Sequence, residues 1–440
     1  MWKFLLTKQK FFKNLKWHLL ISLVFFSISL AVLESKRTTN PYYYDEVSWI
    51  CNGRVWNELT TGRWNSQVWT EDYVQTRNPQ LGKYILGFWI QNKYGQTGFQ
   101  AFNCPGWGSL MWTPGLSALT FHQREILFWS RIPMMILGAV SVALLYVIST
   151  QLFFPLIGAT SAVILLLSPL FQVSVNRAMP DSPLLLFFLI TILLIRLESN
   201  TKDKPFTLRL KYAVILGVCT GLAISTKPYG LLLPLFIIIL WFTQLTIHFL
   251  TRHVFRIHDM AVLIINIGVL VLTMSATMFI FNPTFWGRDN TFINWVPNWF
   301  TAHRELAKLD SEWNKQIIFI TPLVRVTDLS LGFVFPGNWI YAIITPFFNV
   351  VSFFTGLCII CKQTLKQRFE SGEFFLVLWF AAFILLSPLY VQFRYYRYYI
   401  PLLPPFILIE AIGLFFLLGF LVRLFKHLVN PEGGKILPLN

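Results

Sequence analysis

Charged side chains are scarce in this sequence. They account for 13% of its 440 residues, compared with about a quarter in ordinary soluble domains, while 55% of the residues are hydrophobic. So few charges cannot cover the surface of a soluble protein of this size, and apolar segments recur along the whole chain. The sequence therefore predicts an integral membrane protein that crosses the bilayer many times.

Several functional signatures are also missing. The sequence contains no G-x-x-x-x-G-K-[S/T] segment, which excludes a P-loop pump within this chain. It shows neither the two-fold internal repeat that is common in secondary transporters nor a repeated pore segment. The net charge is +16, yet Lys and Arg lie mostly at the ends of apolar segments, which argues against nucleic-acid binding. A transporter or flippase of lipid-linked saccharides remains an alternative to a membrane enzyme.

Cysteine is rare, with five residues in the chain. Cys51 and Cys104 lie in the same polar segment, so they could form a disulfide if that segment faces an oxidising compartment. Such a pair is more often two free thiols, and the sequence leaves open whether Cys51 and Cys104 form a disulfide.

The apolar segments predict the topology. The first, residues 17–33, follows five lysines and lacks a clear cleavage site, which indicates a retained helix. Residues 132–176 are long enough for two helices of about 20 residues each. Further spans are expected at residues 182–196, 211–226, 229–249, 260–281, 338–361, 374–390 and 399–422. The expected fold is a single all-α polytopic domain over residues 1–440, with about ten transmembrane helices.

Two polar segments, residues 34–127 and 282–337, are too long for tight turns and are expected to be loops on the external face. The first is rich in Trp, which is typical of interfacial helices, and the aromatic residues of the second fit a surface helix or a sugar platform. The loops near 197–210, 250–259 and 362–373 are basic, so these loops and both termini are expected in the cytoplasm.

Five segments with ionisable residues reach the external boundary. They are Tyr43-Tyr44-Asp45-Glu46, residues 77–83, Arg177 to Asp181, Thr226 to Gly230, and Arg394 to Tyr399. Ionisable groups at membrane depth are costly and therefore tend to mark a functional site. Carboxylates beside several cations are typical of a site where a polar acceptor meets an anionic lipid-linked donor.

In their order along the chain, these motifs resemble those of the GT-C membrane glycosyltransferases. The similar branch contains the dolichyl-phosphate-mannose protein mannosyltransferases and the lipid A aminoarabinose transferases. The matching elements are Asp45-Glu46, Asn78 to Lys83, Arg177 with Asp181, Lys227 to Gly230, and Arg397-Tyr398 before Pro401, Pro404 and Pro405. Asn78 and Gln80 replace the usual His and Pro, so no role of that His is transferred. A large soluble insert is absent, which favours a bacterial relative in the plasma membrane.

The resemblance implies sugar transfer from a polyprenyl-phosphate-linked donor to a hydroxyl of a lipid, glycan or protein acceptor. Asp45 is the expected general base, and Glu46 is expected to orient the acceptor or to help hold a metal. Asp181 is the second acid, with an ion pair to Arg177 as the alternative. The candidates for binding the donor phosphate are Arg394, Arg397, Lys83, Lys227 and Arg177. Tyr44 and Asn78 belong to the acceptor side, and a divalent metal near Asp45, Glu46 and Asp181 is left open.

Overall fold

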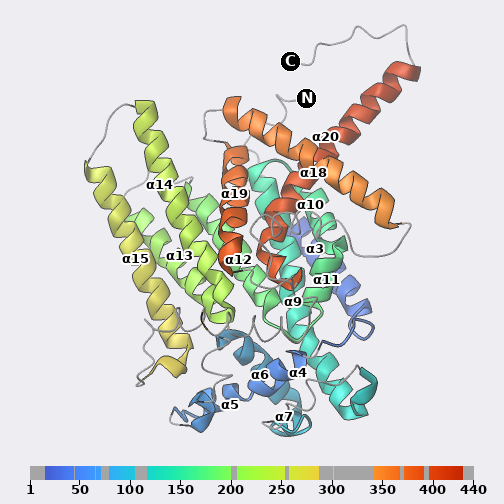
Figure 1. The fold of residues 1–440 in the computed structure, drawn as a ribbon, viewed down its shortest axis with the longest axis vertical. Coiled ribbons are helices and arrows are strands. Elements are labelled where there is room, and N and C mark those ends of the chain that lie inside the picture. Colours follow the sequence, from blue (N-terminus) through green and yellow to red (C-terminus); the bar gives the residue numbers. More distant parts are fainter. Residues whose placement is uncertain are drawn as a thin grey trace.

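The computed structural model describes residues 15–43, 45–64, 66–70, 79–104, 116–199, 206–252, 257–286, 301, 341–366, 371–390 and 396–429. Every regular element within these ranges is a helix. A bundle of long helices carries a layer of short helices at one end (Figure 1). The short helices are α4 (Asp45–Asn52), α5 (Val55–Thr60), α6 (Leu81–Tyr94) and α7 (Thr97–Gln100), all from the first predicted loop.

The long helices coincide with the apolar segments. They are α3 (Leu15–Ser35), α9 (Phe121–Leu152), α10 (Pro155–Leu167) followed by α11 (Pro169–Val175), α12 (Asp181–Ser199), α13 (Phe206–Thr226), α14 (Leu232–Arg252), α15 (Ile257–Phe281), α18 (Tyr341–Lys366), α19 (Gly372–Tyr390) and α20 (Leu403–Val429). In the described part of the chain, seven helices are long and apolar enough to cross a membrane, or eight if α10 and α11 form one span. The polytopic helical fold is confirmed, and the total of about ten spans stays a prediction.

The chain bends by 64° between α10 and α11. Pro169 has no N–H to continue the helix, and the Ser168 hydroxyl instead accepts a hydrogen bond from the Phe171 N–H at 3.4 Å. After the bend, the short helix α11 ends at Val175, just before the Arg177–Asp181 segment. A helix break thus delivers one of the polar motifs to its position.

Helices α13 and α15 pack closely along a seam of small residues. A Cβ added at Gly217 would overlap the Thr273 hydroxyl, and one added at Gly221 would lie 2.7 Å from the Thr277 Cβ. In lipid the hydrophobic effect does not drive helices together, so close packing of small residues is a main source of helix association.

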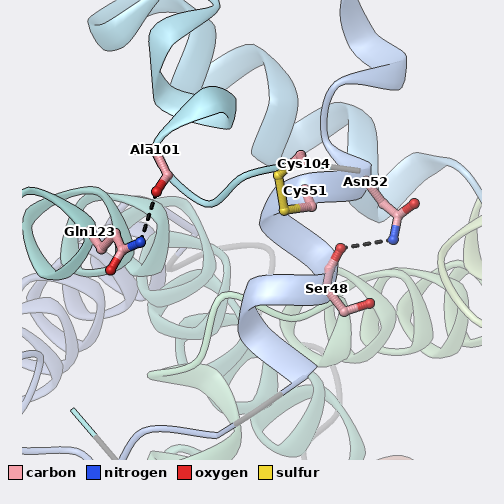
Figure 2. Close-up of a disulfide and its surroundings, with 6 residues drawn as sticks. All are labelled: Ser48, Cys51, Asn52, Ala101, Cys104 and Gln123. Atoms are coloured by element: carbon pink, nitrogen blue, oxygen red, sulfur yellow. Dashed lines mark hydrogen bonds between the residues drawn. A yellow bond between two sulfur atoms is a disulfide. The ribbon is translucent and has the colours of Figure 1, made fainter. Parts of the chain in front are cut away.

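A disulfide between Cys51 and Cys104 joins α4 to the segment after α7 (Figure 2). The two Cα atoms are 5.5 Å apart, a usual separation for a disulfide, and the bond answers the question that the sequence left open. The same segment is tied to α9, because the Gln123 side chain donates a hydrogen bond of 2.8 Å to the Ala101 carbonyl. The layer of short helices is therefore cross-linked within itself and attached to the bundle.

Candidate functional site

Three of the predicted motifs meet where the layer of short helices contacts the bundle. The Glu46 carboxylate accepts a hydrogen bond from the Ala178 N–H at 2.9 Å, which joins the first motif to the third. A Cβ at Gly82 would lie 2.6 Å from the Pro180 Cβ, so the start of α6 lies directly against the same segment. Segments more than 90 residues apart in the sequence are therefore neighbours in space.

Two further motifs join them. The Lys227 ammonium, just before the 3-10 helix η4 (Pro228–Leu231), bonds the Asp181 carboxylate at 2.5 Å. The 3-10 helix η6 (Tyr396–Leu402), which carries the backbone of Arg397, contacts α11 and α12 on either side of the third motif. All five motifs thus contribute at least part of their backbone to one region of the molecule.

Glu46 forms a fully buried ion pair with Arg131 of α9. Its two carboxylate oxygens lie 2.8 Å from Nε and 2.7 Å from Nη2 of Arg131, and both side chains are fully buried. The remaining sites on this carboxylate receive the N–H groups of Ala178 and Tyr43. Arg131 also donates to the Arg37 carbonyl at 2.7 Å. With its hydrogen-bonding capacity used in this way, Glu46 has the environment of a residue that positions α4.

Asp45 differs from its neighbour in exposure. It is the first residue of α4 and remains half-buried, whereas Glu46 is fully buried. Successive residues of a helix point about 100° apart, so the two carboxylates of this pair face different surroundings. The positive end of the helix dipole also favours a carboxylate at this position. Of the two acids, Asp45 is the one whose side chain is accessible to a substrate.

Asp181 pairs with Lys227, so the expected alternative of an ion pair with Arg177 is wrong. Asp181 is 1% exposed and Lys227 is 5% exposed, so the two charges neutralise each other away from water. The second oxygen of Asp181, Oδ2, is buried and has no hydrogen-bond partner among the residues that the structure describes. Buried carboxylate oxygens are rarely left without a donor, which makes this atom a candidate contact for a ligand hydroxyl. Arg177 instead lies over the Tyr43 ring, with Cζ 4.3 Å from the ring centroid.

Lys83 is completely buried at the start of α6. Its ammonium donates to the Gln80 side-chain oxygen at 3.4 Å. Burial lowers the pKa of Lys83 to about 7. Near neutral pH this lysine therefore exchanges between a neutral and a cationic form, and the approach of an anionic phosphate would favour the cation.

Four predicted contributions lie outside the described part of the structure. Tyr44, Asn78 and Arg394 are not described, and of Arg397 only the backbone is. Of the loop predicted at 282–337, only residues 282–286 and 301 are described. The roles assigned to these residues therefore stay predictions from the sequence.

Two of the three acids expected near a divalent metal are engaged by protein cations in this arrangement. Within the described ranges, no three His, Cys, Asp or Glu side chains are grouped closely enough to hold an ion. Glu46 is committed to Arg131, and Asp181 has one of its oxygens bonded to Lys227. These are charge pairs rather than the free oxygen ligands that a hard cation needs.

Sequence reasoning missed several residues here. Arg131 directly precedes the apolar run at 132–176 and resembles an ordinary boundary charge, so only its contacts reveal its role. Asn282, at the end of α15, contacts Gln80 of one motif and Ser225 directly before another, and it carried no local signal at all. Cys358 and Cys361 form a Cys-x-x-Cys spacing that the sequence interpretation overlooked. Both are free and exposed on α18.

The buried lysine allows a prediction about stability. The pKa of Lys83 is lower in the folded chain than its ordinary value of 10.5, so between about pH 7 and pH 10.5 the unfolded chain binds the proton more tightly. The stability of the wild-type protein therefore rises with pH in this window. Lys83→Met removes the cost of burying the charge, on the order of a few kcal/mol. The variant should unfold at a higher temperature at pH 7, with the gain shrinking toward pH 10.5.

Thermal unfolding in detergent between pH 6 and pH 10 measures this difference. Lys93→Met is the matched control, because Lys93 lies near the other end of α6 and is exposed. A pH-independent difference between the Lys83 variant and the wild type would show that Lys83 does not carry the effect.

Comparison with known proteins identifies the family. A family model described as dolichyl-phosphate-mannose-protein mannosyltransferase matches residues 48–287. No curated protein matches the sequence. Among solved structures, the Archaeoglobus fulgidus oligosaccharyltransferase in its apo form has a TM-score of 0.54 at 13% identity, over 98% of this chain and 54% of that one. Apo ArnT from Cupriavidus metallidurans has a TM-score of 0.51 at 15% identity, over 95% of this chain and 65% of that one.

The two solved structures share the fold of this chain, and this chain spans less than two thirds of the length of either. The predicted resemblance to the GT-C glycosyltransferases is confirmed by the family match and by this fold. Since the matched residues make up more than half of the chain, the protein belongs to the dolichyl-phosphate-mannose-protein mannosyltransferase family.

Proposed function

We propose that this protein is a membrane glycosyltransferase that moves a sugar from a polyprenyl-phosphate-linked donor to a hydroxyl group of an acceptor. One observation carries the proposal. The start of α4, the Lys83 turn and the Asp181–Lys227 pair meet at one end of the helix bundle. Membership of the family supports the donor class, because dolichyl-phosphate-mannose is a sugar joined through phosphate to a polyprenyl lipid.

Asp45 acts as the general base. The acceptor oxygen attacks the anomeric carbon on the face opposite the phosphate, and Asp45 takes the hydroxyl proton. The bond from the anomeric carbon to the phosphate oxygen breaks, and its electron pair leaves with the phosphate. The products are a glycosylated acceptor of inverted configuration and free polyprenyl phosphate. Such a base typically contributes about 10²–10⁴-fold to the rate.

Glu46 does not share the chemistry. Its ion pair with Arg131 supports a positioning role, in which it holds the start of α4 against α9 and the Arg177–Asp181 segment. This differs from the acceptor-orienting or metal-binding role expected from the sequence, because the carboxylate of Glu46 is occupied by protein donors.

The developing negative charge on the phosphate is stabilised by fixed cations. Arg394 and Arg397 are assigned to it first, because the planar guanidinium binds two phosphate oxygens at once. Lys227 bonds Asp181, Lys83 is buried at the start of α6, and Arg177 lies over Tyr43 at the same end of the bundle. Asp181 binds a hydroxyl of the sugar or acceptor through Oδ2, the oxygen that Lys227 does not contact.

The site is assigned to the external face of the membrane, with both termini in the cytoplasm. The disulfide between Cys51 and Cys104 supports this orientation, because stable disulfides form in oxidising compartments. The basic loops predicted on the opposite side support it independently.

A transfer assay tests the proposal. The purified protein is reconstituted in liposomes with a panel of polyprenyl-phosphate sugars and candidate lipid, glycan and peptide acceptors. The expected result is a covalent product of inverted configuration, together with one released polyprenyl phosphate per sugar moved. Movement of the intact donor across the bilayer without any covalent product would instead identify a flippase and overturn the proposal.

A further inference from the structure

The side chain of Asn282 joins three separate segments beside the site. Asn282 follows α15, directly before the 3-10 helix η5 (Pro283–Phe285), and is 3% exposed. Its oxygen accepts the Gln80 N–H at 3.1 Å. Its nitrogen donates to the Ser225 hydroxyl at 3.1 Å and to the Met278 carbonyl at 2.6 Å. One carboxamide therefore links the start of α6 to the ends of α13 and α15.

Two of the three linked segments lead directly to a cation of the proposed site. Gln80 is the N-cap residue of α6, and its side-chain oxygen accepts a hydrogen bond from Lys83 three residues later. Ser225 lies two residues before Lys227, which bonds Asp181. Asn282 therefore bridges the backbone near Lys83 to the backbone near Lys227.

Asparagine suits this bridge because it accepts and donates at once. Aspartate at this position would keep the bond from the Gln80 N–H but lose both donated bonds and bury a charge. Leucine has a similar shape but makes none of the three bonds, and it would remove the Asn282 oxygen that accepts the Gln80 N–H. Each buried polar group left unpaired typically costs about 1–3 kcal/mol. A change at Asn282 is therefore relieved most easily by movement of α6 away from α13.

We propose that Asn282 is a positioning residue that sets the separation of Lys83 and Lys227, and thereby the geometry in which the donor phosphate is bound. The inference rests on the proposed function, because the two lysines matter to it as phosphate ligands. Asn282 itself touches neither donor nor acceptor. Its effect reaches the reaction through Gln80 and Ser225.

The variant Asn282→Leu tests the inference. Misplacement of a bound reactant by about 1 Å can cost 10²-fold, so the variant should lose about 100-fold in kcat for lipid-phosphate sugar transfer. Asn266→Leu is the matched control, because Asn266 is a buried asparagine of α15, 16 residues before Asn282 and away from the site. The control should keep wild-type kcat and KM. Wild-type kinetics in Asn282→Leu would overturn the inference.

Two further measurements separate positioning from general damage. Ser225→Ala removes only one hydroxyl, so it should fold normally and lose about 10-fold in kcat, on the scale of one lost hydrogen bond. Hydrogen exchange tests the bridge through Asn282 without any catalysis, because the Gln80 amide should exchange faster in Asn282→Leu but not in Asn266→Leu. Unchanged exchange at Gln80 would refute the bridge through Asn282. Absence of transfer by the wild-type protein would instead refute the proposed function, and the exchange result would still decide whether Asn282 holds Gln80 in place.

Discussion

Replacing Asp45 with asparagine should lower the rate of sugar transfer by about 10²–10⁴-fold, the usual contribution of a general base. Asparagine has nearly the same shape as aspartate but cannot take the proton of the attacking hydroxyl. Because Asp45 is half-buried and begins α4, the substitution should leave insertion and the Glu46–Arg131 pair intact. Single-turnover release of polyprenyl phosphate from labelled donor in liposomes measures the loss.

Asp259→Asn is the matched control for Asp45→Asn. Asp259 lies in the first turn of α15, at the opposite end of that helix from Asn282, so its loss should not change the rate. Full activity in the Asp45 variant would rule out Asp45 as the base and would remove the mechanism proposed here.

Arg131→Met should destabilise the protein by about 3–5 kcal/mol, because it leaves the Glu46 carboxylate buried without its partner. It should also inactivate the protein, since the Glu46 bonds that hold α4 to the Arg177–Asp181 segment would be disturbed. The double variant Glu46→Gln with Arg131→Met removes both charges and should recover part of the stability. Thermal unfolding of the three proteins in detergent gives the comparison.

Arg124→Met provides the control for this pair. Arg124 lies two turns earlier on the same helix and makes no described ion pair. If Arg131→Met is as stable and as active as Arg124→Met, the buried pair does not hold α4 in place.

Local sequence patterns predicted where the helices of this fold lie, but they predicted the contacts between these helices less well. Apolar runs located the long helices, because length and hydropathy decide which segments cross a bilayer. The partner of Glu46 lies 85 residues away and that of Asp181 lies 46 residues away. Periodicity carries no information on such pairings, so Arg131 was missed, and the ion pair considered as an alternative for Asp181 was with its near neighbour Arg177.

The motifs themselves were visible because each combines ionisable residues with a membrane boundary. Their meeting at one end of the bundle follows from the topology, which brings alternate helix ends to the same side. Which charges neutralise one another depends on side-chain packing instead. Lys227 was expected only as a ligand of the donor phosphate, yet it forms an ion pair with Asp181 in the folded chain.

The packing of α13 against α15 connects the proposed site to residues in the middle of these two helices. Gly221 lies about one helical turn before Ser225, and Thr277 lies about one turn before Asn282. A methyl group at Gly217 or Gly221 would wedge the two helices apart, and the Ser225–Asn282 hydrogen bond at their ends would open first. Substitutions in the middle of these helices are therefore restricted by the contacts that their ends make beside the proposed site. Random mutagenesis of the gene should therefore recover inactive variants at Gly217 and Gly221, which lie in the packed seam rather than among the proposed site residues.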